Sequence, residues 1–181
     1  VDLALDAADQ LLAKDPADPY FLELKGQVLL ESGRPHEALD PLRRATAMTN
    51  AEPLIASLFG HALIATEDDG NFEEAERVLR AAVGRDRRNP FAWYQLGVVY
   101  AARGDTARAR LASAEYHYAV GQVEQVMNRQ YGLALRSAQA AEYGLEHGTP
   151  DWIRAQDIGM QARALLERQC EMERGRDCAP G

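Results

Sequence analysis

Apolar residues recur along this chain with the three- and four-residue spacing of one face of an α-helix, and long strand-like runs are absent. Polar turns that contain Asp, Gly or Pro separate these segments. The chain is therefore predicted to be all-α. Helices are expected at Asp2–Lys14, Tyr20–Glu31, Pro35–Met48, Pro53–Thr66, Asn71–Arg85, Pro90–Arg103 and Asp151–Gln169.

Three glycines inside these apolar segments have a regular spacing. Gly60 follows Gly26 by 34 residues, and Gly97 follows Gly60 by 37. The same two intervals, in reverse order, separate the alanines Ala38, Ala75 and Ala109 of the following helices. The spacing predicts a helix–turn–helix repeat of 34 residues with one insertion of three residues, which we place in the polar turn 67–70.

The segment 93–100 carries the signature of such a repeat. Trp93, Leu96, Gly97 and Tyr100 occupy the first-helix positions of the tetratricopeptide repeat (TPR). The three large residues lie on one helical face, and the glycine allows a neighbouring helix to approach closely. The chain thus resembles a TPR protein, an α-solenoid whose repeats bury their apolar faces against one another.

The repeat pattern weakens after Gly104. Ser113 stands where the signature has a large aromatic residue, and Tyr116 stands where it has a small one. The segment 106–127 contains no strong helix breaker other than Gly121, so one long helix and two helices meeting at a kink are both compatible with it. The spacing of a second helix returns at Tyr131, Ala134 and Ala141.

The domain organisation follows from this frame. Residues 1–169 are predicted to form a solenoid of about four repeats that ends in a capping helix, and residues 170–181 a polar tail. The frame places Ala4 and Pro16 in the second half of a preceding repeat. The chain is therefore expected to begin within a repeat and to be a fragment of a longer protein that continues upstream of Val1.

The amino-acid composition argues against two classes of binding partner. The net charge of −8 and the isoelectric point near 5.0 argue against nucleic acid or an anionic membrane, because both need a basic surface. The one basic cluster, Arg85–Arg88, is interpreted as a solvated turn between repeats. No apolar run approaches the ~18 residues of a membrane span.

The two cysteines indicate a compartment only if they are paired. Cys170 and Cys178 lie eight residues apart in the polar tail. A bridge between them would imply an oxidising compartment, whereas in the cytosol both would stay reduced. Paired cysteines in an exposed segment favour the bridge.

The segment His36-Glu37-Ala38-Leu39-Asp40 is the nearest approach to a catalytic motif. It resembles the zinc-protease motif His-Glu-x-x-His, but Asp40 occupies the position of the second histidine. The repeat frame already accounts for these residues. No nucleophile, metal set or phosphate loop is recognised, so no catalytic or metal-binding residue and no cofactor is expected in this chain.

A TPR solenoid binds through its concave groove, which first-helix residues line. In this frame the predicted groove residues are Tyr20, Glu23, Gln27 and Leu30, then Leu54, Ser57, His61 and Ile64, then Phe91, Tyr94, Val98 and Ala101. No Lys or Arg is among them, which argues against a clamp for acidic chaperone tails. An apolar and aromatic groove suits an extended peptide or a helix of another domain. For Leu30, Leu54 and Val98, packing between repeats is an equally good interpretation.

Two stretches, 21–33 (FLELKGQVLLESG) and 148–158 (GTPDWIRAQDI), together with Leu111–Glu115, resemble the C-terminal TPR domain of the periplasmic BepA-type zinc metalloproteases. About seven residues between Gly121 and Tyr131 are additional to that family's pattern, and the cysteine-containing tail also departs from it.

The resemblance implies a particular setting. In that family an upstream peptidase domain holds zinc and hydrolyses substrates, while the TPR domain recruits substrates and engages the outer-membrane protein assembly machinery. None of the zinc ligands can be placed in this sequence. The chain is therefore expected to be non-catalytic and periplasmic, with polypeptide or another domain as its partner. The alternative is a stand-alone TPR scaffold or cochaperone, with a cytoplasmic location also open.

Overall fold

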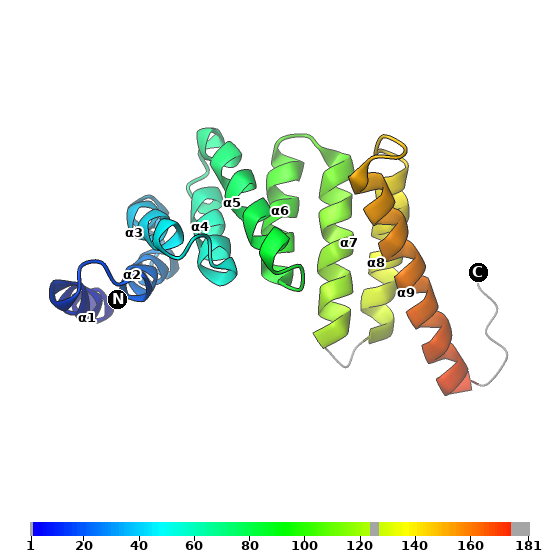
Figure 1. Ribbon diagram of the computed structural model, residues 1–181, viewed down its shortest axis with the longest axis horizontal. Helices are drawn as coiled ribbons and strands as arrows, with labels where there is room; N and C mark the ends of the chain where they lie inside the picture. Colours follow the sequence, from blue (N-terminus) through cyan, green and yellow to red (C-terminus); the bar gives the residue numbers. More distant parts are fainter. Residues whose placement is uncertain (1, 124–126, 175–181) are drawn as a thin grey trace. The chain divides into compact units, whose positions relative to one another are not determined.

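The computed structural model of the chain describes residues 2–123 and 127–174, and every regular element in this part of the chain is helical (Figure 1). The predicted all-α fold is confirmed. The helices fall into two compact units, divided between Arg87 and Arg88.

Unit 1 contains two helix–turn–helix pairs preceded by a single helix. The predicted boundaries agree with the observed ones to within one residue. Its elements are α1 (Asp2–Lys14), α2 (Pro19–Glu31), α3 (Pro35–Met48), α4 (Pro53–Ala65), the 3₁₀-helix η1 (Asp69–Asn71) and α5 (Phe72–Arg85).

The first helix of each pair begins with the same local chemistry. Pro19 and Pro53 stand in the first turn, where a missing N–H has no partner to lose. Just before them, the side chains of Asp18 and Glu52 each accept hydrogen bonds from two backbone N–H groups of the first turn. These acceptors satisfy donors that the helix leaves unpaired, so the sequence fixes the start of both helices.

The three-residue insertion lies in the turn between α4 and α5, as predicted. In the α2–α3 turn Gly33 takes a left-handed backbone conformation with φ of 73°. In the α4–α5 turn Glu67 takes that conformation, with φ of 55°, and the added residues form η1. Gly70 lies within η1. It follows Gly33 by the interval of 37 residues, but it does not take the left-handed conformation of Gly33.

Close contact between glycine and leucine holds each pair of unit 1 together. A Cβ atom added to Gly60 would lie 2.5 Å from Leu79 Cγ, and one added to Gly26 would overlap Leu42 Cγ in the same way. Both leucines are fully buried. Gly26 and Gly60 thus have the role that the sequence predicts for Gly97, which is to admit a neighbouring helix closely. At Gly97 itself that prediction is wrong, because a Cβ atom added there would have only ordinary contacts, 3.5 Å to Ala112 Cβ.

The loop between α3 and α4 contains two residues in the left-handed region. Asn50 and Ala51 have φ values of 52° and 57°. The guanidinium group of Arg85, at the end of α5, donates hydrogen bonds to the backbone carbonyls of both residues. Arg85, predicted to be a solvated turn residue, is exposed but also ties this loop to α5.

Replacing Ala51 with glycine should stabilise unit 1. A left-handed conformation costs a non-glycine residue roughly 1–2 kcal/mol, part of which is offset by the greater freedom of glycine in the unfolded chain. We expect the free energy of unfolding to rise by about 1 kcal/mol in guanidinium titrations followed by circular dichroism. Ala81→Gly, at an exposed position inside α5, is the control and should lower it by about 1 kcal/mol.

Unit 2 contains the helices α6 (Pro90–Ala102), α7 (Thr106–Val123), α8 (Met127–Glu142) and α9 (Pro150–Arg174). Of the two alternatives for 106–127, the long helix is observed up to Val123, because α7 runs through Gly121 without a break. A Cβ atom added to Gly121 would lie 2.8 Å from Tyr131 Cε1 on α8. Gly121 is thus a packing residue and not a helix breaker.

Helices α7, α8 and α9 lie side by side and enclose the core of unit 2 (Figure 1). The residues predicted to restore the repeat spacing all belong to this core, which is built from Leu111, Ala114, Tyr131, Ala134, Ala138, Ala141, Ala155, Ile158 and Ala162. The final helix is longer than predicted: it continues past Gln169 to Arg174, so the predicted tail at 170–181 begins inside α9. Cys170 lies in α9, but Cys178, its predicted partner, lies outside the described residues, so their pairing stays a prediction.

A buried ion pair fastens α9 to α7. Glu115 is 2% exposed, and its two carboxylate oxygens accept hydrogen bonds from Arg154 Nε at 2.6 Å and Nη2 at 2.8 Å. This bidentate geometry is the strong form of the arginine–carboxylate pair. The hydrogen bond to Glu115 raises the pKa of Arg154 above its usual value, so the guanidinium group stays charged.

Candidate functional site

The candidate binding face of unit 1 is carried by its first helices, α2 and α4. Tyr20 and Leu54, each near the start of its helix, have exposed fractions of 62% and 65%. Gln27 is also exposed, and its side-chain amide donates a hydrogen bond to Glu31 Oε1 at 2.8 Å. The exposure of Leu54 favours the groove interpretation of that residue over packing between repeats.

The remaining predicted residues of this face are less accessible. Glu23, Leu30 and His61 are partly buried. Ser57 corrects the prediction, because its side chain is fully buried and its hydroxyl donates a hydrogen bond to the Pro53 carbonyl. A serine that bonds back to its own helix in this way is unavailable to a ligand.

The electrostatics of this face favour a neutral or basic ligand. Partial burial raises the pKa of Glu23 above its usual value, and the negative charge of nearby Glu52 raises it further. Both effects disfavour the ionised carboxylate. A cationic group of a ligand close to Glu23 would have the opposite effect on its pKa, because a nearby positive charge favours the ionised carboxylate.

On unit 2 the candidate face is carried by α6. Phe91 and Tyr94 have exposed fractions of 42% and 55%, while Val98 is partly buried. Asn89 caps this helix by accepting a hydrogen bond from the Ala92 N–H at 3.0 Å, which fixes the start of the helix and the placement of the aromatic residues that follow.

A cavity of about 410 Å³ opens between α6 and α7, next to these aromatic residues. Its size is within the range of small-ligand pockets. Residues of both helices line it, namely Trp93, Tyr94, Gly97, Val98, Ala101, Ala109, Ser113, Tyr116 and His117. The lining is mainly apolar and aromatic.

Three rings form one wall of this cavity. The ring centroids of Tyr94 and Tyr116 are 5.8 Å apart, and those of Tyr116 and His117 are 4.9 Å apart. His117 Nδ1 lies 2.9 Å from Gln130 Oε1 on α8, which orients the imidazole. The wall is therefore held by contacts between rings and by a hydrogen bond to α8.

The sequence predictions found only part of this site. Tyr94, Val98 and Ala101 were among the predicted groove residues, but the α7 residues of the cavity were not. Their signal was present in the sequence, since Ser113 and Tyr116 were the two departures from the repeat signature. Ser113 stands where the signature has a large residue, so it leaves space between the helices. Tyr116 stands where the signature has a small residue, and its ring borders that space.

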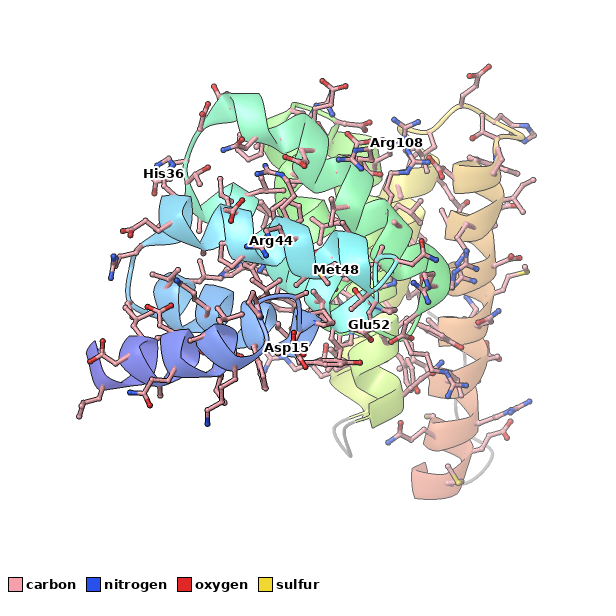
Figure 2. All side chains as sticks on the ribbon, turned by 60° about the vertical axis from the view of Figure 1, so that its left-hand side comes forward. Asp15, His36, Arg44, Met48, Glu52 and Arg108 are labelled. Carbon is pink, nitrogen blue, oxygen red and sulfur yellow. The ribbon has the colours of Figure 1, made fainter. Side chains whose placement is uncertain are left out.

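The residues that resemble a zinc-protease motif form no catalytic arrangement. His36 is exposed near the start of α3, at the opposite end of that helix from Met48 (Figure 2). Both carboxylate oxygens of Glu37 accept hydrogen bonds from Arg34, and this lowers the Glu37 pKa. Within residues 2–123 and 127–174, no group of three or more His, Cys, Asp or Glu side chains is placed to hold a metal ion.

None of the helices in the described part of the chain is both long and apolar enough to cross a membrane. The predicted groove positions of the two units also contain no Lys or Arg. On the described residues, these faces offer mainly apolar and aromatic contact, with Glu23 and Gln27 as polar groups on the face of unit 1.

A family model described as the tetratricopeptide repeat matches residues 1–53 and 65–123 of the chain. The match thus covers helices of both units and ends at the last described residue of α7; α8 and α9 lie outside it. No curated protein matches the chain significantly.

Two crystal structures of MamA are similar in fold. One has a TM-score of 0.59 at 18% sequence identity, and the match covers 92% of this chain and 89% of that chain. The other has a TM-score of 0.58 at 17% identity, with 99% and 88% covered. At these identities the likeness shows the fold alone.

Proposed function

We propose that this chain, which belongs to the tetratricopeptide repeat family, is a non-catalytic module that binds polypeptide through the exposed faces of its first helices. Tetratricopeptide repeats form α-solenoids whose extended surfaces bind other proteins. The observation that carries the proposal is the exposure of large apolar side chains at the predicted groove positions. Tyr20, Leu54, Phe91 and Tyr94 are each more than 40% exposed.

Aromatic residues at such positions suit polypeptide binding. A tyrosine presents a large rigid surface and loses little conformational freedom when a ligand covers it. The rings of Tyr94 and Tyr116 support one another, so Tyr94 is already oriented before a ligand arrives. Binding through these residues would follow the usual pattern in which a few aromatic anchors supply most of the energy.

Replacing Tyr94 with alanine should weaken polypeptide binding by roughly 1–3 kcal/mol, because an aromatic anchor is lost. The measurement is fluorescence anisotropy with a permanently unfolded basic probe, reduced and carboxamidomethylated ribonuclease A. Tyr143→Ala is the matched control, because Tyr143 is 92% exposed but lies outside the predicted groove positions. Equal affinities for the parent chain and both variants would contradict the proposal, provided that circular dichroism shows Tyr94→Ala to be folded.

We further propose that the chain is the substrate- and partner-recruiting TPR domain of a periplasmic BepA-type zinc metalloprotease. The support is the similarity of residues 21–33 and 148–158 to that domain. Zinc would then be held by an upstream peptidase domain, and the outer-membrane assembly machinery would be a candidate partner. The runner-up is a stand-alone scaffold or cochaperone.

The coding sequence upstream of Val1 distinguishes these two proposals. A His-Glu-x-x-His peptidase domain preceded by a secretory signal would support the protease assignment and the periplasmic location. Further TPR repeats, or a sensor or secretion-system domain, would contradict that assignment and support the free-standing scaffold. Polypeptide binding by this chain is expected in both cases.

A further inference from the structure

The cavity between α6 and α7 lies where the other repeats place a leucine. In the α2–α3 pair Leu42 packs against Gly26, and in the α4–α5 pair Leu79 packs against Gly60. In both pairs the leucine lies four residues after the buried alanine of the second helix. The glycine and the leucine together fill the space between the two helices.

In the α6–α7 pair the corresponding position is Ser113, four residues after Ala109. A serine side chain is too short to fill the space next to Gly97. A Cβ atom added to Gly97 would have ordinary contacts, 3.5 Å to Ala112 Cβ and 3.7 Å to the Ala109 carbonyl oxygen. Gly97 and Ser113 both line the 410 Å³ cavity, so the cavity lies where the regular repeats have leucine.

The helix that follows is also placed differently. In unit 1, α4 packs against both α2 and α3, the two helices of the preceding pair. In unit 2, α8 packs against α7 and α9. Ser113 faces this shifted helix, with its hydroxyl oxygen 3.4 Å from that of Ser137. The cavity therefore remains open beside Tyr94 and Val98, on the candidate binding face.

We propose that this cavity is a pocket for a leucine-type apolar side chain of a polypeptide partner, which takes the place of the leucine that the third repeat lacks. The proposal rests on the proposed function, since it names the side chain that the α6 face selects. Leucine is the expected occupant because the first two repeats of this chain fill the equivalent space with leucine. The mainly apolar lining favours an uncharged side chain, because a charged one would lose part of its hydration there.

The probe for this pocket is N-acetyl-leucinamide, with N-acetyl-alaninamide and N-acetyl-lysinamide for comparison. In ¹H–¹⁵N spectra of the full chain, we expect the leucine derivative to shift amide signals within 93–101 and 109–117. Its affinity should be at least about tenfold higher than that of the alanine derivative, since the larger side chain buries more apolar surface. The lysine derivative should leave these signals unchanged.

Filling the pocket should abolish this binding. Ser113→Leu restores the missing leucine, and Ala101→Leu obstructs the pocket from an exposed position without disturbing the packing. Gln122→Leu adds a leucine at an exposed site on α7 outside the pocket and should leave binding unchanged. If Ser113→Leu does not fold, Ala101→Leu decides the question.

The outcomes separate this inference from the proposed function. Unchanged leucine-derivative binding in folded Ser113→Leu or Ala101→Leu would overturn the pocket, as would signal shifts confined to other helices. If the unfolded ribonuclease A probe still binds the chain in that case, the proposed function stands. A chain that binds the leucine derivative but no polypeptide would overturn both the proposed function and the polypeptide source of the side chain.

Discussion

Replacing Arg154 with alanine will lower the free energy of unfolding of unit 2 by about 3–5 kcal/mol. The reason is that Glu115 is 2% exposed and receives both of its hydrogen bonds from Arg154. Without the guanidinium group, a buried carboxylate would have to remain unpaired or become protonated. The expected result is early unfolding of α9 in guanidinium titrations and faster hydrogen exchange along that helix.

Two variants test whether the buried charge is the cause. Arg168→Ala removes an exposed arginine from the same helix and should change the unfolding free energy by less than about 0.5 kcal/mol. The double variant Glu115→Leu/Arg154→Leu removes both charges and should be much closer to the parent than Arg154→Ala, because apolar replacements of a buried pair are often neutral. Equal effects of Arg154→Ala and Arg168→Ala would show that the ion pair does not hold α9 in place.

Replacing Gly60 with alanine will destabilise unit 1 by about 3 kcal/mol, near the upper end of the cost of overpacking. The added methyl group would lie 2.5 Å from Leu79 Cγ, a branch-point atom of a fully buried side chain that cannot simply swing away. This penalty exceeds the gain of up to about 1 kcal/mol that alanine brings to a helix interior. Guanidinium titration followed by circular dichroism measures the difference.

Gly97→Ala is the matched control, since Gly97 has the same place in its repeat. A methyl group there would meet Ala112 Cβ at 3.5 Å, an ordinary contact. We expect this variant to be neutral or more stable by up to about 1 kcal/mol. If Gly60→Ala and Gly97→Ala changed the free energy of unfolding alike, the distinction between a repeat in which leucine packs against the glycine and one that lacks this leucine would be wrong.

The fold was largely predictable because its determinants are local. Pro19 and Pro53, with the acceptors Asp18 and Glu52, fix where the first helices begin. The glycine spacing fixes the repeat and places the insertion. What the sequence could not show depends on contacts between distant segments: the roles of Gly121 against Tyr131 and of Glu115 with Arg154 become visible only when α8 and α9 are in place.

The candidate site was predictable in part for a related reason. Helical spacing identifies residues that share a face, so Tyr20, Leu54, Phe91 and Tyr94 were found and are exposed. Spacing alone does not show whether a small polar residue faces outward or bonds to its own helix, so Ser57 was misplaced. A cavity forms where the side chains of two helices do not fill the space between them. The sequence did not show this space, because it depends on how α6 and α7 are placed relative to one another.

Binding of polypeptide by the first helices is best tested by hydrogen exchange of the chain with and without reduced, carboxamidomethylated ribonuclease A, read by mass spectrometry. We expect the polypeptide to slow exchange in segments 20–30, 54–64 and 91–101, the predicted binding segments of α2, α4 and α6. Exchange in α3 and α5 should change little. Protection confined to those second helices, or no protection at a saturating polypeptide concentration, would contradict binding by the first helices.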